Sequence, residues 1–185
     1  MISIDYISGL ADRLTRKYQT RDPFKICDAL GVTIRYKDLG TDIKAFYYYK
    51  SRIRNIVLNF RVSETVQKVL VAHELGHDRL HQDIAMLRGF QEIGLFDHTI
   101  LPAEYEANLF AAELLIDDGE LMELFNDEDK LFFGAAKELQ IPAELLDFKF
   151  RVMKHKGYRI NAQYMSNSNF LKNDIAGCFD QEHIP

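Results

Sequence analysis

Two histidines and a glutamate near the middle of the chain have the types and the spacing needed for catalysis with a metal ion. His73 and His77 lie four residues apart in the segment 71–81, which reads VAHELGHDRLH. Residues four apart share one face of an α-helix, so both imidazole rings can reach a single point, with Glu74 beside them. Two imidazole nitrogens suit zinc, and an adjacent carboxylate that stays off the metal can act as a base. Because H-E-x-x-H is a short pattern, this interpretation requires a helix and a third ligand.

The residues around this motif predict a helix that buries both histidines. Ser63 is a favourable N-cap, and Glu64 in the first turn interacts favourably with the helix dipole. Apolar residues at positions 66, 69, 70 and 80 share one face with His73 and His77. Two buried histidines beside a glutamate would leave several polar groups without partners, and a bound metal removes that difficulty. We therefore expect the pair to bind a metal rather than to fill an ordinary core position.

The third ligand is expected from a second helix, predicted over residues 102–115 by its composition and by the proline that begins it. Zinc enzymes that keep one position for water commonly use two histidines and a carboxylate. Glu104 is the preferred carboxylate, because its face continues through small residues that permit close helix packing, namely Ala107, Asn108 and Ala111. Glu106 and Glu113 remain alternatives, and either can instead be a solvated surface acid. Asn108 is expected to hydrogen-bond a ligand rather than the metal.

The other elements predict an α+β fold that is mostly helical. The first twenty residues have the periodicity of an amphipathic helix, and a second, short helix spans about residues 23–30, between an Asp-Pro cap and a glycine. β-Branched and aromatic residues then predict three antiparallel strands, the last two forming a hairpin, at 32–36, 45–49 and 55–59. We expect this small antiparallel sheet to pack beside the helix that carries the histidines.

Composition and charge narrow the class of protein. The chain has 185 residues, of which 47% are hydrophobic, and a net charge of −5, which disfavours nonspecific attraction to nucleic acid. Cys27 and Cys178 are far apart and form no metal-binding spacing, which indicates free thiols in a reducing compartment. The N-terminus does not have the pattern of a signal peptide, and no apolar run approaches about 18 residues. We expect a cytoplasmic protein without a membrane partner.

The C-terminal third raises a rival function. We divide the chain into a core at 1–117 that contains the proposed metal site, a helical part at 118–157 and a polar tail at 158–185. Two helices of the middle part, joined by Gln140-Ile141-Pro142, are arranged like a helix-turn-helix, and the second carries Lys149, Arg151, Lys154, His155 and Lys156. DNA binding is therefore possible in principle, although nearby acidic residues dilute the positive charge. We expect packing or docking of a protein partner here rather than contact with nucleic acid.

The two predicted ligand helices together resemble those of the ImmA/IrrE metallopeptidases. The matching residues are HELGH at 73–77, Leu-His at 80–81, and the pattern E-x-x-A-N-x-F-A-x-x-L-L at 104–115. The similarity extends from the N-terminal helices to about Gly157. One departure is the sequence Ile-Asp-Asp-Gly at 116–119, where the family often has a proline. The resemblance implies a gluzincin-like zinc endopeptidase with His73, His77 and Glu104 as metal ligands and Glu74 as catalytic base.

The resemblance also implies a biological role. Such an enzyme cleaves a helix-turn-helix transcriptional repressor encoded by a mobile element, a phage or a stress locus, and so relieves repression. Two alternatives stay open, namely an anti-repressor that acts by binding alone and a regulator that binds DNA. The repressor would be the protein substrate of the peptidase and the binding partner of the anti-repressor.

Several features of the mechanism are left open by the sequence. The sequence does not locate the donor that stabilises the oxyanion. Tyr48, His81, His98 and Tyr105 are candidates, but each fits a structural role better, and His81 can anchor the helix by a hydrogen bond. The strand at 55–59 is a candidate wall of the cleft that receives the substrate as an added strand. Cys178 and His183 in the tail can in principle reach back and mask the zinc.

Overall fold

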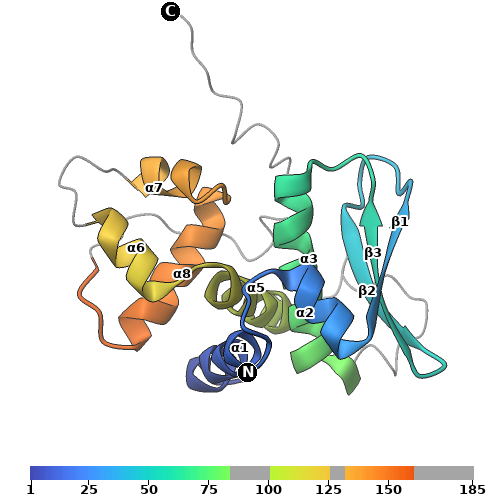
Figure 1. Cartoon of the computed structure of the whole chain (residues 1–185), viewed down its shortest axis with the longest axis horizontal. Helices are drawn as coiled ribbons and strands as arrows, with labels where there is room; N and C mark the ends of the chain where they lie inside the picture. Colours follow the sequence, from blue (N-terminus) through green and yellow to red (C-terminus); the bar gives the residue numbers. More distant parts are fainter. Residues whose placement is uncertain (84–100, 126–131, 161–185) are drawn as a thin grey trace, which may run out of the picture.

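The computed structural model describes residues 1–83, 101–125 and 132–160, and it confirms a mostly helical α+β fold. Helix α3 (Glu64–Leu80) lies at the centre, with a three-stranded sheet on one side and α5 (Leu101–Leu115) on the other (Figure 1). The arrangement encloses one core to which the helices and the sheet all contribute. Among the described residues, no helix combines the length and the apolar character that a membrane span requires.

Both predicted N-terminal helices are confirmed, and the second has the bounds and the Asp-Pro cap that the sequence predicts. Helix α1 spans Ile4–Tyr18, and the Ser3 side chain accepts a hydrogen bond from the Tyr6 amide at its start. Helix α2 spans Pro23–Leu30, begins at an Asp22 cap and ends at Gly31, whose φ of +71° is the left-handed conformation that glycine adopts easily. Local capping chemistry therefore sets both helices.

The sheet contains β1 (Val32–Lys37), β2 (Ala45–Lys50) and β3 (Ile53–Asn59), in the order β1-β3-β2. The predicted hairpin is confirmed, because β2 and β3 pair antiparallel across a tight turn. The prediction of a fully antiparallel sheet is wrong, because β1 pairs with β3 in parallel. The sheet is mixed, with β3 in its middle.

The connection between β1 and β2 explains the parallel pairing. Residues 38–44 carry the chain past the position that β3 occupies, so that β3 returns between the two earlier strands. The Asn59 side chain holds this loop by donating to the carbonyl oxygens of Gly40 and Ile43, at 2.7 and 2.9 Å. An ion pair between Arg61 and Asp38, at 2.6 Å, fastens the same loop from outside. These long-range contacts are absent from the local alternation that predicted the strands.

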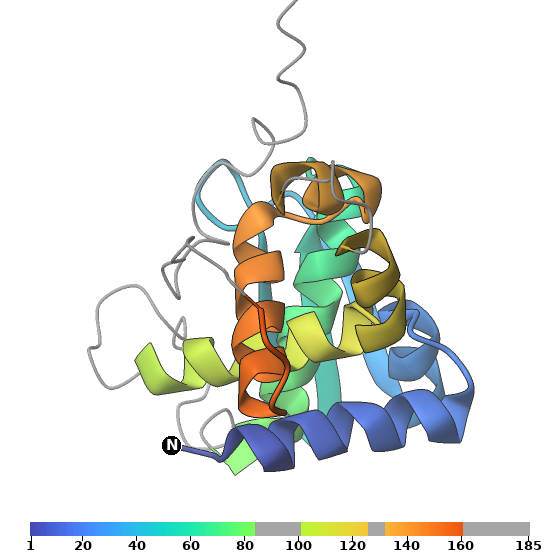
Figure 2. The same ribbon diagram turned by 90° about the vertical axis from the view of Figure 1, so that its left-hand side faces the viewer.

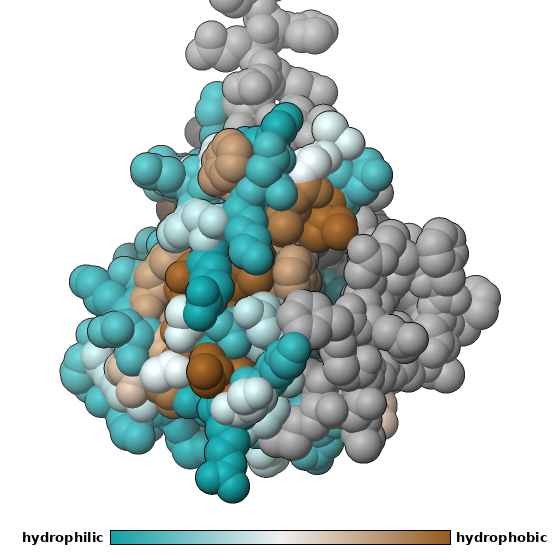
Figure 3. All heavy atoms as spheres, turned by 90° about the vertical axis from the view of Figure 1, so that its right-hand side faces the viewer, coloured by the Kyte–Doolittle hydropathy of each residue, from teal (hydrophilic) through white to brown (hydrophobic). Residues whose placement is uncertain are grey.

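The central position of β3 overturns one expectation about substrate binding. Both hydrogen-bonding edges of β3 are already paired, so residues 55–59 cannot receive a substrate as an added strand. The outer strands β1 and β2 carry the remaining edges of the sheet. Figure 3 shows the sheet side of the molecule, where apolar areas lie between hydrophilic ones. Large hydrophobic side chains of the three strands and the following residue that are exposed to solvent include Tyr36, Ile53 and Phe60.

A buried aspartate joins the sheet to α3. The Tyr47 hydroxyl of β2 donates to Asp78 Oδ1 at 2.9 Å, and Arg54 of β3 contacts Asp78 Oδ2 at 3.3 Å. Arg54 also donates to the Leu30 carbonyl at the end of α2. Asp78 follows His77 directly, so these contacts fix the rotation of α3 about its axis. Cys27 is a free, buried thiol beside this group, and burial raises its pKa to about 12, which keeps it protonated.

The C-terminal helices are α6 (Asp118–Phe125), α7 (Phe132–Glu138) and α8 (Ala143–His155). Helix α8 crosses α5, and α1 runs alongside α5 and past one end of α8 (Figure 2). Most side chains of α8 are buried, including Leu146, Phe148 and Val152. This helix is therefore a core element of the described structure.

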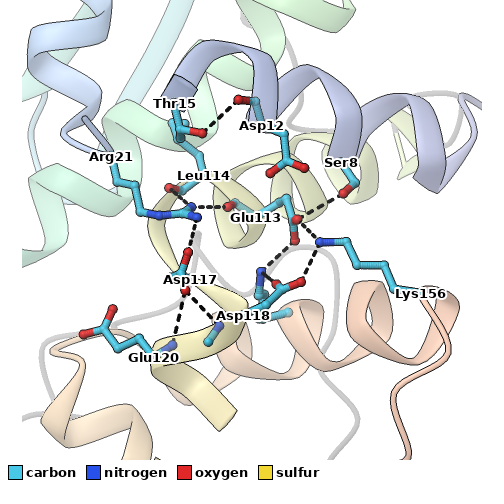
Figure 4. A network of polar contacts seen from close by, with 12 residues as sticks. Ser8, Asp12, Thr15, Arg21, Glu113, Leu114, Asp117, Asp118, Glu120 and Lys156 are labelled. Atoms are coloured by element: carbon cyan, nitrogen blue, oxygen red, sulfur yellow. Dashed lines mark hydrogen bonds and ion pairs between the residues drawn. The ribbon is translucent and has the colours of Figure 1, made fainter. Parts of the chain in front are cut away.

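A network of buried charges attaches α8 to α5 and α6 (Figure 4). Lys149 is 1% exposed and pairs with Glu113 at 2.7 Å and with Asp118. Lys156 contacts the same two carboxylates, and the Ser8 hydroxyl of α1 donates to Glu113 at 3.0 Å. Each buried charge thus has an opposite charge beside it, as burial requires.

This network predicts a specific loss of stability in acid. Burial alone would raise the pKa of Asp118, but hydrogen bonds and charge from Lys149 and Lys156 outweigh it and hold the pKa below 3.8. A depressed pKa contributes stability above the unfolded value of 3.8, and that contribution is lost as the pH falls through the lower folded value. Asp118→Asn should therefore reduce the free energy of unfolding by about 1–3 kcal/mol at pH 7.

Urea denaturation from pH 7 down to a pH below the folded pKa of Asp118 measures this effect. The wild type and Asp118→Asn should differ most at neutral pH and converge in acid. Glu120→Gln changes an exposed carboxylate of the same helix and should follow the wild type throughout. A difference for Asp118→Asn that does not shrink on acidification would contradict the assignment.

Candidate active site

The second half of α3 is buried on every side, which places its two histidines inside the protein. Every residue from Val69 to Asp78 is buried, including His73, Glu74 and His77. The imidazole rings of the two histidines lie edge to face with centroids 4.8 Å apart. The helix predicted from Ser63 onward is confirmed, although the Ser63 side chain makes no capping hydrogen bond.

Three side-chain donors converge at one point between α3 and α5. His73 Nε2 and His77 Nε2 lie 3.2 Å apart, and the Glu104 carboxylate lies 3.3 Å from the first and 3.5 Å from the second. Ligand atoms placed about 2.0–2.1 Å from a tetrahedral zinc ion are themselves ~3.3–3.4 Å apart. The three separations therefore fit a small tetrahedral cation, and among the described residues these three form the group able to hold one.

Close packing of the two helices makes this convergence possible. A Cβ atom placed on Gly76 would lie 3.1 Å from the Ala107 Cα of α5 and 3.2 Å from a ring carbon of Phe110. Small residues on both helices therefore let the backbones approach, as expected for the Ala107 face of α5. Gly76 itself is a positioning residue that the motif analysis did not single out, although a glycine inside a helix is a signal of close approach.

Each histidine is oriented by a second side chain. His73 Nδ1 lies 2.8 Å from the Asn108 side-chain oxygen, which can accept its hydrogen, so Nε2 keeps its lone pair for the converging point. His77 Nδ1 lies 3.1 Å from His81 Nδ1. The hydrogen bond expected for Asn108 is present, and His81 contacts His77 rather than facing an open cleft.

The electrostatics of the trio favour a bound cation. Burial would lower the pKa of His73, but a hydrogen bond and the charge of Glu104 raise it above 6.5. For His77, burial outweighs the same help from Glu104, and its pKa lies below 6.5. Burial would raise the pKa of Glu104, yet its hydrogen bonds to both histidines hold that pKa well below the usual range. Glu104 is thus a buried anion that a metal cation would neutralise.

Glu74 lies next to this trio without belonging to it. It is 7% exposed, and its charge is close enough to help raise the pKa of His73. A carboxylate in this position is near the converging point and does not supply one of the three donors. A general base likewise lies beside the reacting groups.

The other candidate residues take different places. Glu106 and Glu113 are buried, at 3% and 2% exposed, so the alternative of solvated surface acids is wrong for both. Tyr105 packs against Phe148, with ring centroids 5.6 Å apart. Tyr48 points to the face of β2 opposite Tyr47, because side chains alternate along a strand. His98, Cys178 and His183 lie outside the described residues.

Most basic residues in and just after α8 form ion pairs within the protein, whereas Lys154 is exposed. Lys149 and Lys156 belong to the buried network, Arg151 pairs with Asp147 at 2.7 Å, and His155 lies 2.9 Å from Asp5. A recognition helix presents its cations to phosphates and base edges instead. The arrangement favours the expectation that nucleic acid is not the partner of this helix.

The close approach at Gly76 predicts an unusual response to alanine. Alanine in a helix is ordinarily more favourable than glycine by about 1 kcal/mol. At Gly76 the added Cβ meets backbone that must move, and such overpacking costs about 1–3 kcal/mol. Gly76→Ala should lower the free energy of unfolding, whereas Gly134→Ala, where no atom lies within 4 Å of an added Cβ, should raise it. Equal gains for both variants in chemical denaturation would rule out tight packing at Gly76.

A second prediction concerns metal content. Glu104→Gln keeps the size of the side chain but removes the negative charge and one ligand oxygen, so bound metal should be lost on dialysis. Glu113→Gln alters another buried glutamate of α5 and should keep its metal. Atomic absorption on both purified variants decides the matter. Wild-type metal content in Glu104→Gln would shift the ligand assignment to another residue.

Comparison with known proteins agrees with this geometry. The model of the Peptidase M78 family, described as the IrrE N-terminal-like domain, matches residues 27–151, which include both α3 and α5. An immunity region protein of Bacillus phage phi105, itself described as uncharacterized, is 32% identical over 143 residues, covering 77% of this chain and 88% of that protein. The metallopeptidase ImmA of Bacillus subtilis is 24% identical over 176 residues, covering 90% and 98%.

The family match and the site agree on the same helices. The matched residues contain the whole converging trio together with Glu74. The extent of the match, over more than half of the chain, shows common ancestry rather than a short shared motif. The chain belongs to the Peptidase M78 family of metal-dependent peptidases and contains its IrrE N-terminal-like domain.

Proposed function

We propose that this protein is a zinc-dependent endopeptidase that cleaves a helix-turn-helix transcriptional repressor and so relieves repression. The observation that carries the proposal is the convergence of His73, His77 and Glu104 at the separations of a tetrahedral site, with Glu74 beside them. Family membership supports peptide hydrolysis as the reaction. Two neutral imidazoles and one carboxylate form a common ligand set of catalytic zinc.

In this proposal His73, His77 and Glu104 would hold a zinc ion. A zinc ion there supplies Lewis acidity, which lowers the pKa of a coordinated water and polarises the scissile carbonyl. Glu74 takes a proton from the attacking water and later delivers it to the nitrogen of the departing amine. The C–N bond of the peptide breaks, the hydroxyl of the water is added to the carbonyl carbon, and its proton passes through Glu74 to the amine nitrogen.

The surroundings of Glu74 suit this role. The neighbouring side chains of α3 are buried, so water is largely excluded and the charge of Glu74 is weakly screened. The hydrogen bond to Asn108 fixes the orientation of the His73 ring, so His73 stays in place as a ligand while the neighbouring Glu74 acts as the base.

The choice of substrate rests on the relatives. One relative is named for a phage immunity region and another is named as the metallopeptidase ImmA. Immunity is a state of repressed transcription, so a peptidase in such a region has a repressor as its natural target. The repressor encoded beside the gene for this chain is the first protein to test.

Glu74→Gln separates catalysis from metal binding. The amide cannot accept the proton of water, so cleavage of the purified repressor should fall by about 10²–10⁴-fold, while zinc remains bound. Gel electrophoresis of repressor incubated with each zinc-loaded variant measures the first effect, and atomic absorption measures the second. Chelation of the zinc should stop the wild-type reaction, and restored zinc should restart it.

The same variant distinguishes the enzyme from an antagonist that only binds. If the protein acts as a peptidase, cells that produce Glu74→Gln should keep the target gene repressed. Full derepression by this variant would show that contact with the repressor is sufficient, and the peptidase proposal would then be wrong.

A further inference from the structure

A line of hydrogen bonds extends from His77 away from the proposed metal position. His77 Nδ1 lies 3.1 Å from His81 Nδ1, and His81 Nε2 lies 2.8 Å from Glu106 Oε2. The other Glu106 oxygen, Oε1, accepts the backbone N–H of Ile2 at 2.5 Å. The line thus connects α3 to α5 and ends at the first residues of the chain.

The chemistry of these groups gives the line one direction. An ionised carboxylate only accepts hydrogen bonds, so the hydrogen between His81 and Glu106 is on His81 Nε2. A neutral His81 then has a lone pair at Nδ1, which accepts the hydrogen of His77 Nδ1. His77 is therefore left with its lone pair at Nε2, the atom that lies 3.2 Å from His73 Nε2.

We propose that His81 and Glu106 are positioning residues that fix the tautomer of His77, so that its Nε2 lone pair faces the metal position. This inference rests on the proposed metal site. Asn108 fixes the tautomer of His73 through a single hydrogen bond. The tautomer of His77 is fixed through two hydrogen bonds, one to His81 and one from His81 to Glu106. In both histidines the Nε2 lone pair therefore faces the metal position before a metal binds.

Burial makes the carboxylate the deciding group. His77, His81 and Glu106 are at most 7% exposed, so solvent water does not readily replace a missing partner. His81 is also held by its backbone, because its N–H donates to the His77 carbonyl at 2.9 Å at the end of α3. Ile2 occupies the second oxygen of Glu106, which keeps the carboxylate from turning away from His81.

The double use of Glu106 makes Glu106→Gln a sharp test. A glutamine has one accepting oxygen and one donating NH₂ group at nearly the same positions. If the oxygen faces Ile2, the NH₂ group faces His81 Nε2 and reverses both hydrogen bonds, which puts a hydrogen on His77 Nε2. If the oxygen faces His81, two donors meet at Ile2. The first arrangement reverses the tautomer of His77, and the second keeps it only at the cost of two donors facing each other at Ile2.

The first measurement reads the tautomers directly in the full-length, metal-free protein. Long-range ¹H–¹⁵N NMR of imidazole-labelled protein should show wild-type His77 protonated at Nδ1 and His81 protonated at Nε2. Glu106→Gln should increase the population of His77 protonated at Nε2. Wild-type His77 protonated mainly at Nε2 would overturn the inference, and this result needs no variant to fold.

The second measurement is zinc affinity, determined by competition with a chromophoric chelator. Loss of a partner behind a metal ligand weakens binding by about 10- to 100-fold, and we expect this range for Glu106→Gln and for His81→Phe. The double variant should bind zinc no more weakly than His81→Phe, because both changes interrupt one line. Glu113→Gln, the buried glutamate of α5 outside the line, should bind like the wild type.

Unchanged affinity in Glu106→Gln, or additive losses in the double variant, would overturn the inference. Failure of the proposed function looks different. A protein that binds zinc tightly and shows the expected tautomers, yet cleaves no repressor, would contradict the peptidase proposal and leave the roles of His81 and Glu106 intact.

Discussion

The closeness of α3 and α5 is the constraint on which the rest of the structure depends. The histidines belong to one helix and Glu104 to the other, so the site exists only while the two backbones nearly touch. Gly76 and Ala107 provide this contact through the absence of side-chain bulk. The other elements hold the pair in place, with the sheet and α2 on one side and α1 and α8 on the other (Figure 1). Metal chemistry in this fold is thus a product of helix packing.

Polar groups are buried throughout the molecule, and each set is balanced locally. Asp78 is paired by Tyr47 and Arg54, and Glu113 is paired by two lysines. In the trio the outward-facing nitrogens of the histidines are likewise satisfied, while the inward-facing donors are directed at one another. Hydrogen bonds from the histidines satisfy part of the Glu104 carboxylate, and a cation at the same point would be bound by all three side chains at once. The fold therefore stores a binding preference for a metal ion.

Local patterns predicted what local chemistry decides. The cap at Asp22, the hairpin and the helix around the histidines all depend on residues close in sequence. The parallel direction of β1 depends on Asn59 holding a loop 16 and 19 residues earlier in the chain, which no alternation pattern contains. Likewise, Glu113 resembles a surface acid until Lys149, 36 residues away, is placed beside it. For the site, the motif indicated the candidate metal ligands and a hydrogen bond from His81. The partners of His81, namely His77 and Glu106, became known only from the folded structure.

The hydrogen bond from the Ile2 amide to Glu106 has a practical consequence. Three hydrogen bonds, through Glu106 and His81, connect the Ile2 amide to the candidate metal ligand His77. A change beside Ile2 that breaks the first of these bonds would free the carboxylate that faces His81. Recombinant protein for metal analysis is therefore best produced with its first residues unaltered.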